Sequence, residues 1–294
     1  MSVYVIGGIN QDIVATSESH PRPGETLTGS DLNYYPGGKG ANQAIAAARA
    51  GASVAMIGCT GNDAAGNDLR NYLADAGVDV SRVRARDEAP TGTALIVVAN
   101  GENSIIVVLG ANEHVAPDSL DGLSFTEEDI VVAQFETPIE TTLTAFKRAR
   151  KAGARTILNP SPVTPIQPEL LSHIDFLVVN EHEFELIFET PLAPVLTDNA
   201  GKPDAFTGTL VITLGSEGVL TLTEKDRIRQ AGQAVEVVDS TGAGDCFVGY
   251  LASALHNRDS LASAIELANL AASISVTRPG AASSIPDLKS LSQP

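Results

Sequence analysis

The residues most suited to chemistry lie at positions 239–245, Asp-Ser-Thr-Gly-Ala-Gly-Asp. Gly242 and Gly244 let the backbone turn sharply and let a ligand approach, and the segment that begins at Asp245 has the pattern of an amphipathic helix. The free N–H groups of a first helical turn bind anions. A carboxylate beside such an anion hole, formed by Gly242, Ala243 and Gly244, would repel a phosphate unless it takes a proton from the attacking group. The stretch therefore predicts Asp245 as a catalytic base; the alternative is a tight turn with Asp245 as a helix N-cap.

Amide, carboxylate and lysine side chains gather where predicted strands end. Asn10 and Asp12 follow the first apolar run, Glu136 follows a later one, and the Gly-Gly-Lys-Gly-Ala-Asn stretch at 37–42 opens an alanine-rich helix. Each residue alone could be a cap or turn residue. Together they suit a polyol with neighbouring hydroxyl groups, because carboxylates and amides accept and donate hydrogen bonds in pairs. The set predicts a sugar pocket.

Apolar runs rich in β-branched residues alternate with helical segments along the chain. Strands are expected at 3–6, 54–57, 130–133, 156–158, 176–179, 210–213 and 235–238, and helices at 39–50 and from about 138. Repeated strand-helix units predict an α/β fold, a doubly wound and mostly parallel sheet with helices on both faces. Ligands bind such sheets beyond the carboxyl ends of the strands, which is where the polar residues above lie.

Two stretches interrupt this alternation. The β-rich runs 93–99 and 104–109 flank Asn100-Gly101, a strong hairpin signal. Both runs are apolar on both faces, so we expect them, with the extended stretch 21–36, to form a small β-sheet that covers the site and pairs with a second subunit. The alternative is two more central strands. The Pro-, Asp- and Gly-rich stretch 189–208 is predicted to be a loop.

The composition narrows the function classes. The 294 residues carry a formal net charge of −17, which argues against nucleic acid or an anionic membrane as a partner. We find no targeting segment and no apolar run long enough to span a bilayer, and the two cysteines, Cys59 and Cys246, have no metal-ligand spacing. We therefore expect a cytoplasmic protein without disulfides, in which Cys246 is a packing residue.

The helix-opening stretch 37–52 and the glycine turn 239–251, taken together, closely resemble the two signatures of the ribokinase-like, or PfkB, carbohydrate kinase family. The resemblance extends to the segments 8–12, 134–138, 159–162, 179–183 and 213–215. It implies a single kinase domain over 1–294, with a β lid formed near 13–36 and 91–111. It also implies transfer of the γ-phosphoryl group of ATP to a sugar hydroxymethyl group, with Mg²⁺ accompanying the nucleotide. The doubly apolar hairpin described above leads us to expect a homodimer that forms through this lid.

The resemblance assigns roles residue by residue. The residues expected to bind the sugar are Asn10, Asp12, Gly38, Lys39, Asn42, Glu136 and Asp245. The nucleotide contacts are expected at Asn180, Thr213, Leu214, Gly215, Ser216, Glu217, Gly218, Gly244 and Asn269, with Glu183 associated with Mg²⁺. Potassium or another monovalent cation is expected to activate the enzyme from a site made of Asp239, Thr241, Ser275, Arg278, Gly280 and Ser284.

Several alternatives remain open from the residues alone. A dinucleotide oxidoreductase would need G-x-G-x-x-G, which is absent after the first strand and at the 242–244 turn. A non-catalytic sugar-binding homologue would be expected to have lost the base or the glycines, and both are present. Within the kinase class, D-ribose is the expected acceptor; 2-deoxyribose, another pentose, a ketohexose or a nucleoside are the alternatives.

Overall fold

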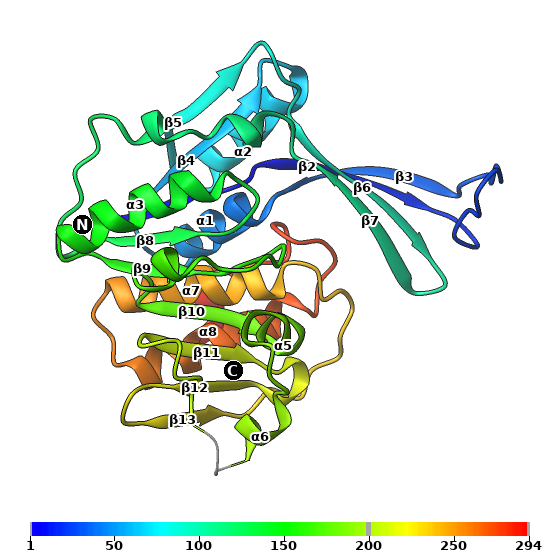
Figure 1. The fold of residues 1–294 in the computed structure, drawn as a ribbon. Helices are drawn as coiled ribbons and strands as arrows, with labels where there is room; N and C mark the ends of the chain where they lie inside the picture. The colour runs from blue at the N-terminus through cyan, green and yellow to red at the C-terminus, as the bar shows by residue number, and fades with distance from the viewer. Residues whose placement is uncertain (1, 198–200, 293–294) are drawn as a thin grey trace.

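The computed structural model describes residues 2–197 and 201–292. Within them, the main body is built on a nine-stranded sheet with the order β13-β12-β11-β10-β9-β8-β1-β4-β5 (Figure 1). The strands are β1 (Val3–Ile6), β4 (Val54–Gly61), β5 (Val78–Arg86), β8 (Ile130–Ala133), β9 (Arg155–Leu158), β10 (Phe176–Asn180), β11 (Thr209–Thr213), β12 (Val219–Leu222) and β13 (Arg227–Gln230). All neighbours pair in parallel except β11 with β12 and β12 with β13. The predicted α/β fold with a mostly parallel sheet is confirmed.

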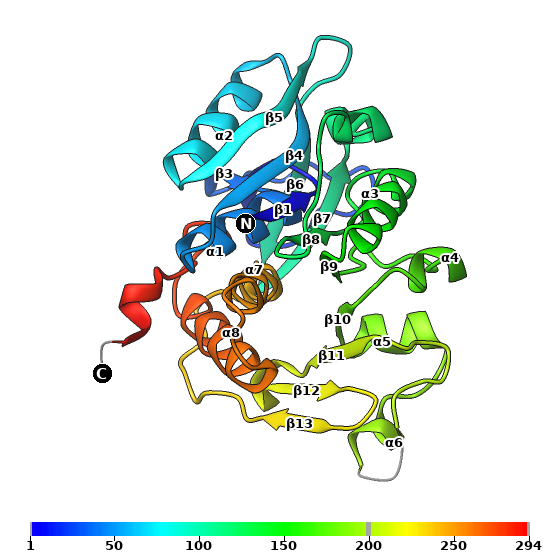
Figure 2. The ribbon, with the colours of Figure 1, turned by 90° about the vertical axis from the view of Figure 1, so that its left-hand side faces the viewer.

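Helices cover both faces of this sheet (Figure 2). On one face lie α1 (Lys39–Arg49), α2 (Ala64–Asp75), α7 (Ala243–His256) and α8 (Leu261–Ser275); on the other lie α3 (Ile139–Lys151), α4 (Pro168–Leu171) and α5 (Glu181–Phe188). Each layer has its own buried apolar cluster, with Ile45 and Tyr250 in the first and Phe146 and Phe184 in the second. Burial of the strands on both faces explains their continuous apolar runs.

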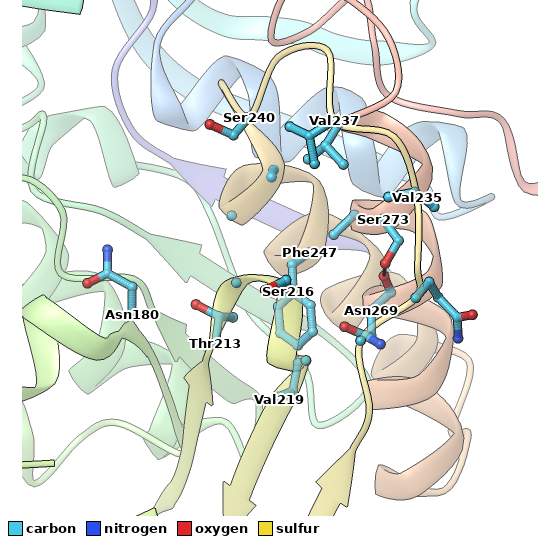
Figure 3. Close-up of a pocket in the computed structure, with 18 of the residues that line it drawn as sticks. Asn180, Thr213, Ser216, Val219, Val235, Val237, Ser240, Phe247, Asn269 and Ser273 are labelled. Carbon is cyan, nitrogen blue, oxygen red and sulfur yellow. Dashed lines mark hydrogen bonds between the residues drawn. The ribbon is translucent and has the colours of Figure 1, made fainter. Parts of the chain in front are cut away.

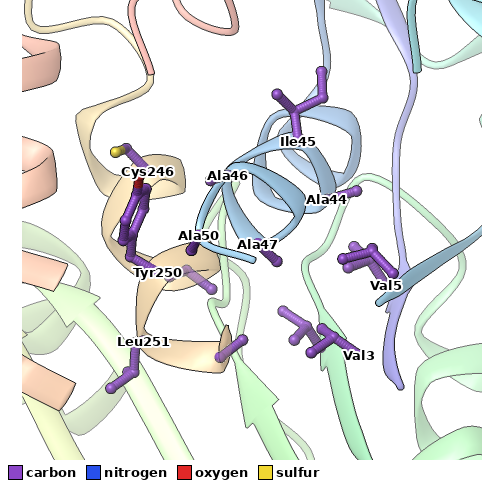
Figure 4. Close-up of a cluster of buried hydrophobic side chains, with 14 of the residues drawn as sticks. Val3, Val5, Ala44, Ile45, Ala46, Ala47, Ala50, Cys246, Tyr250 and Leu251 are labelled. Carbon is purple, nitrogen blue, oxygen red and sulfur yellow. The ribbon is translucent and has the colours of Figure 1, made fainter. Parts of the chain in front are cut away.

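The helices α1 and α7 pack unusually closely, and this contact brings two parts of the site together. A Cβ on Gly249 of α7 would lie 2.4 Å from the Cβ of Ala46 and 2.5 Å from the carbonyl oxygen of Gln43, so only glycine fits there. Figure 4 shows Ala46 of α1 beside Tyr250 of α7. Because the small residues let the backbones approach, polar side chains from the start of α1 reach the start of α7.

A second sheet of four strands, in the order β3-β2-β6-β7, extends from the body (Figure 1). Its strands are β2 (Asn10–Thr16), β3 (Asp31–Gly37), β6 (Gly92–Ala99) and β7 (Glu102–Val108). Asn100 and Gly101 have φ of 54° and 78°, as a two-residue hairpin turn requires. The predicted hairpin is confirmed and the alternative of two more central strands is wrong. Below we call these four strands the lid sheet.

The lid sheet leaves large apolar side chains uncovered in the single chain. Leu95 is 44% exposed, Ile105 50%, Ile106 66% and Tyr34 59%. The strand register places Tyr34, Leu95 and Ile106 in one row across the sheet, on one face, while Ile105 points to the other face. Exposed apolar side chains on both faces of the lid sheet suggest contact with another surface.

Two local predictions near the glycine turn are wrong. The run 235–238 forms no strand: the sheet ends at β13, Val237 and Val238 are exposed, and the valines belong to an extended segment that crosses to α7. The helix α7 is not amphipathic, because every residue from Asp245 to its end is buried between the sheet, α1 and α8. It begins at Ala243, so its N-cap is Gly242, with φ of 74°, and the alternative of Asp245 as the N-cap is wrong.

The structure also tests the predictions for the stretch 189–208, for the two cysteines and for membrane-spanning segments. The expected loop 189–208 contains one short helix, α6 (Ala193–Leu196), and its residues 198–200 lie outside the described residues. Cys59 and Cys246 are free and buried, and burial raises the pKa of Cys246 to about 12, as expected for a packing residue. In the described part of the chain, no helix combines the length and the apolar character needed to cross a bilayer.

Candidate active site

Asp245 lies in the first turn of α7 and is only 6% exposed. Its Oδ2 accepts a hydrogen bond of 2.9 Å from Nδ2 of Asn42, and its Oδ1 accepts one of 2.9 Å from Nε2 of Gln43. Both donors come from α1. Each carboxylate oxygen keeps lone pairs for a further donor, such as a sugar hydroxyl. The geometry thus fixes the carboxylate from one side and leaves it able to accept a proton.

Gln43 belongs to a buried amide network behind Asp245. Its Nε2 also donates to Oδ1 of Asn159 at 3.2 Å, and its Oε1 accepts from Nε2 of Gln134 at 2.5 Å. Gln43 and Gln134 have no exposed surface. The sequence analysis did not select Gln43 as a site residue; the one available signal was a large amide beside Asn42 in a helix otherwise made mostly of alanine.

The glycine turn faces open space. A Cβ added to Gly244 would meet no heavy atom within 4 Å, whereas one on Gly242 would lie 2.9 Å from the Cβ of Ala281. The turn is therefore packed from behind by the 280–284 segment and open in front, at the N-terminus of a 14-residue helix. Helix N-termini attract anions through their N–H groups and the helix dipole.

The predicted sugar residues converge around Glu136. Its Oε2 accepts the backbone N–H of Lys39 at 2.7 Å, and its Oε1 accepts Nδ2 of Asn10 at 3.4 Å. Asp12 lies against Gly37, where a Cβ would come within 2.2 Å of the Asp12 carboxylate. Gly38, with φ of 92°, turns the chain into α1. Glycine at 37 lets strand β3 approach the Asp12 carboxylate, and glycine at 38 lets the chain pass 2.7 Å from the backbone of Gly8 and Asn10, measured from a Cβ placed at Gly38.

Two carboxylates of this pocket, Glu136 and Asp12, have raised pKa values. Burial raises the pKa of Glu136 to about 7; Lys39 opposes the change, while the charges of Asp245 and Asp12 add to it. Burial, followed by the charge of Asp245, raises the pKa of Asp12 to about 6. For Lys39, burial lowers the pKa, but the surrounding carboxylates outweigh burial and leave it above its usual range. Perturbed carboxylates grouped around one lysine are typical of functional sites.

A large cavity of about 850 Å³ lies between the ends of β11 and β12, the glycine turn and α8 (Figure 3). Its walls are mostly apolar, with Val235 and Val237 from the extended segment and Phe247 from α7. Asn269 reaches it from α8 and donates to the carbonyl of Ala231 at 2.9 Å. Two of the three valines predicted as a strand, Val235 and Val237, thus line this cavity. Its size and its apolar lining suit the planar base and ribose of a nucleotide.

Most of the predicted nucleotide residues line this cavity. They are Asn180, Thr213, Gly215, Ser216, Gly218, Gly244 and Asn269. Leu214 instead packs into the apolar core, and Glu217 pairs with Arg229 at 3.4 Å on the surface. The structure therefore brings the segment 213–218 to the cavity but points those two side chains elsewhere.

A smaller cavity of about 190 Å³ connects the two halves of the site. It is lined by Lys39, Glu183, Gly242 and Asp245, among others, and it shares Asn180, Thr213 and Gly244 with the larger one. Anything that extends from the larger cavity toward Asp245 passes the glycine turn.

Asn180 and Glu183, the two ends of the Asn-x-x-Glu segment, form a capping box at the start of α5. The Asn180 side chain accepts the Glu183 N–H at 2.8 Å, and Oε2 of Glu183 accepts the Asn180 N–H at 2.9 Å. This pairing holds Glu183 at the edge of the smaller cavity. In residues 2–197 and 201–292, no group of three or more His, Cys, Asp or Glu side chains is arranged to hold a metal ion.

The residues expected around a monovalent cation are partly brought together. Asp239 Oδ2 accepts the N–H of Gly280 at 2.8 Å, and its Oδ1 accepts the N–H and hydroxyl of Thr241 at 2.9 and 2.6 Å. Burial opposes ionisation of Asp239, but these hydrogen bonds outweigh it and lower its pKa. The Ser275 carbonyl accepts the N–H of Arg278 at 3.2 Å.

Two more hydroxyls of this set lie nearby and are buried. Ser275 and Ser284 are each 1% exposed, and their hydroxyls donate to the carbonyls of Ala272 and Ala281. The loop that carries Ser284 packs behind the glycine turn through Ala281, whose Cβ would lie 2.9 Å from a Cβ on Gly242.

Comparisons with known proteins agree with this geometry. The chain matches the description "pfkB family carbohydrate kinase" over residues 1–288. The ribokinase of Haemophilus influenzae is 40% identical over 294 residues, covering 97% of this chain and 95% of that protein. The ribokinase of Bacillus subtilis is 39% identical over 287 residues, covering 97% and 96%. Among solved structures, an Arabidopsis thaliana ribokinase complexed with ribose and ATP matches with a TM-score of 0.89 and 33% identity, covering 99% of this chain and 97% of that one.

Proposed function

Because the chain belongs to the pfkB family of carbohydrate kinases, we propose that it transfers the γ-phosphoryl group of ATP to the hydroxymethyl group of D-ribose, giving D-ribose 5-phosphate and ADP. The observation that carries the proposal is the position of Asp245. Its carboxylate is held by two amides at the smaller cavity, between the glycine turn and the sugar residues. A base at that point can reach a sugar hydroxyl and a phosphoryl group together.

In the proposed reaction, Asp245 takes the proton of the sugar hydroxyl as its oxygen attacks the γ-phosphorus. The bond between the γ-phosphorus and the bridging oxygen breaks, and ADP leaves. Gly242, Ala243 and Gly244 form the anion hole for the transferring group, whose negative charge the helix start and Lys39 stabilise. Little covalent chemistry is left to the protein, so alignment of the two substrates is the main requirement.

The proposed sugar contacts are Asn10, Asp12, Gly38, Lys39, Asn42 and Glu136. Support comes from their convergence and from the pairing of Glu136 with Lys39 and Asn10. A buried polar pocket of this kind rejects acceptors that leave its groups unpaired, which favours a sugar with neighbouring hydroxyls. The nucleotide is proposed to lie in the large cavity, with its base against Val235, Val237 and Phe247.

Two cations are proposed to assist. Mg²⁺ would supply charge neutralisation to the triphosphate, and Glu183, a hard oxygen donor held by its capping box at the smaller cavity, is the residue we associate with it. A monovalent cation such as K⁺ would be held by oxygens of Asp239, Thr241, Ser275, Arg278, Gly280 and Ser284. The donor set fits because it consists of a carboxylate, hydroxyls and carbonyls, with Arg278 contributing its carbonyl.

We also propose that the whole chain is one kinase domain, that the lid sheet closes over the sugar, and that its apolar face pairs with that of a second copy. The exposed Leu95 and Ile106, which pair across β6 and β7 and lie on one face, support the pairing, while Ile105 lies on the opposite face. A hairpin that is apolar on both faces needs cover on both. A cytoplasmic location is part of the same proposal.

The experiment that tests the proposal is a coupled ADP-release assay of the purified protein with ATP and Mg²⁺. The acceptors to compare are D-ribose, 2-deoxyribose, D-fructose and a nucleoside, each at several concentrations. We expect D-ribose to give the highest kcat/KM. If another acceptor gives a higher kcat/KM, that acceptor would replace ribose in the proposal. If no acceptor leads to ADP release, the result would contradict kinase activity on sugars.

A further inference from the structure

Asn112 is a buried amide that was not among the predicted site residues and that lies behind the sugar pocket. It belongs to the 3₁₀ helix η1 (Gly110–His114), directly after the lid strand β7, and it has no exposed surface. Its side chain makes three hydrogen bonds. Oδ1 accepts the N–H of Ile9 at 2.9 Å, and Nδ2 donates to the carbonyl of Ile9 at 3.3 Å and to Oδ1 of Asn10 at 2.7 Å.

These contacts determine which way two amides point. A backbone N–H can only donate and a backbone carbonyl can only accept, so Ile9 fixes the oxygen and nitrogen of Asn112 without ambiguity. The Asn112 nitrogen then requires an acceptor on Asn10, which must be the Asn10 oxygen. The NH₂ group of Asn10 is left to point at Oε1 of Glu136, 3.4 Å away, on the sugar side.

Close packing of the backbone holds the two amides against each other. A Cβ at Gly92, the first residue of β6, would lie 2.2 Å from Nδ2 of Asn112 and 2.3 Å from Oδ1 of Asn10. The strand β2 begins at Asn10, so Asn112 touches the first residues of both lid strands that lead out of the body. It therefore lies at the base of the lid sheet as well as behind the pocket.

We propose that Asn112 is a positioning residue for the sugar. It sets the orientation of the Asn10 amide, so that Asn10 offers N–H donors to a sugar hydroxyl oxygen while Glu136 accepts a hydrogen bond from a sugar hydroxyl. Asn112 itself does not touch the sugar. The inference rests on the proposed kinase function, since it names a residue that controls acceptor affinity in that reaction.

The test is the isosteric substitution Asn112→Asp, which keeps an acceptor for the Ile9 N–H but replaces the donor toward Asn10 with an oxygen. Asn10 must then turn its own NH₂ group toward position 112 and its oxygen toward Glu136. We expect the KM for ribose to rise about tenfold or more, the factor that corresponds to about 1.4 kcal/mol, with the KM for ATP within twofold of the original. Asn269→Asp is the matched control, because it makes the same change in the nucleotide cavity and should raise the KM for ATP instead.

A double-mutant cycle separates positioning from a purely structural effect. If Asn112 acts through Asn10, then Asn112→Ala should raise the ribose KM in the original chain but add less than twofold in an Asn10→Ala background. Multiplicative effects of the two substitutions, or an equal rise in the KM for ATP and for ribose, would overturn the inference. The cycle also provides the test if Asn112→Asp fails to fold, as judged by circular dichroism.

Different results would contradict the proposed kinase function and the inference about Asn112. An unsubstituted protein that phosphorylates no acceptor would contradict the proposed function. An unsubstituted protein that phosphorylates ribose, combined with an unchanged ribose KM in Asn112→Asp, would contradict the positioning inference alone.

Discussion

The affinity for sugar should depend on pH because two carboxylates in the pocket have raised pKa values. Burial raises the pKa of Glu136 from 4.5 to about 7. Lys39 opposes this change, and the charges of Asp245 and Asp12 add to it. Glu136 is then about nine-tenths ionised at pH 8 and about one-tenth at pH 6. If only the ionised form accepts the sugar hydroxyl, the Kd for ribose rises about tenfold between these pH values. Asp12, whose pKa is raised to about 6, is about half ionised at pH 6 and adds about a factor of two.

The same carboxylate links stability to pH in the opposite sense. A raised pKa means that the folded state favours the protonated form of Glu136. The stabilisation is present in full below the unfolded pKa of 4.5 and is lost as the pH rises toward about 7. Through Glu136, the free energy of unfolding of the sugar-free protein should therefore fall by up to about 3 kcal/mol over this range. Ribose should therefore bind most tightly at the pH values where Glu136 contributes least to the free energy of unfolding of the sugar-free protein.

The assay is isothermal titration of ribose without ATP, since the terminal phosphate of the nucleotide itself titrates near pH 6. We expect the Kd to rise about twentyfold from pH 8 to pH 6. The control is Glu136→Gln, which should bind ribose more weakly at pH 8 and retain only the factor of about two that Asp12 provides. A Kd for the unsubstituted protein that is equal at both pH values, or a full twentyfold change in Glu136→Gln, would refute the reasoning.

Four further outcomes are expected. Asp245→Asn should lower kcat by ~10²-fold or more while leaving ATP affinity in place, as loss of a general base does; near-normal turnover would show that Asp245 is not the base. Gln43→Met, which removes one donor from the carboxylate, should lower kcat about tenfold with little change in either KM; an unchanged kcat would leave Gln43 without a positioning function. Charges at Ile96 and Ile106 should give monomers with a raised ribose KM, by light scattering and kinetics, and an unsubstituted protein that is already monomeric would contradict the lid dimer. Replacing K⁺ with tetramethylammonium at constant ionic strength should lower the rate in the original chain but not in Asp239→Ala; equal rates of the original chain in the two salts would exclude a cation site.

The fold could be predicted because its strands carry a strong local signal. The run at β8 (Ile130–Ala133) is apolar on both faces, as only a strand buried between two helix layers can be. The turn residues were equally informative: Gly38 and Gly242 both have positive φ at helix starts. The hairpin followed from Asn100-Gly101 for the same reason, since the turn type requires positive φ at both positions.

The run 235–238 shows where local patterns fail. Three valines in four residues favour a strand by propensity, but propensity measures fit to a half-buried pleated surface rather than a backbone preference. Here the chain has already completed the sheet edge at β13, and Val238 and Asp239 donate instead to the carbonyl of Val276. Val235 and Val237 are free to line the large cavity. The same composition thus serves a ligand surface, which no pattern in the sequence distinguishes from a strand.

Asn42 was predicted, but two other amides, Gln43 and Asn112, were missed for a different reason. Asp245, the proposed base, could be selected from its neighbours in the sequence, because the glycine turn that surrounds it is local. Gln43 meets Asp245 across 202 positions, and Asn112 meets Ile9 across 103. A buried amide has the same sequence appearance whether it satisfies a backbone group or orients a catalytic one. Only the close packing of α1 on α7, which Gly249 permits, and the return of the chain from the lid sheet to Ile9 determine which of these the amide does.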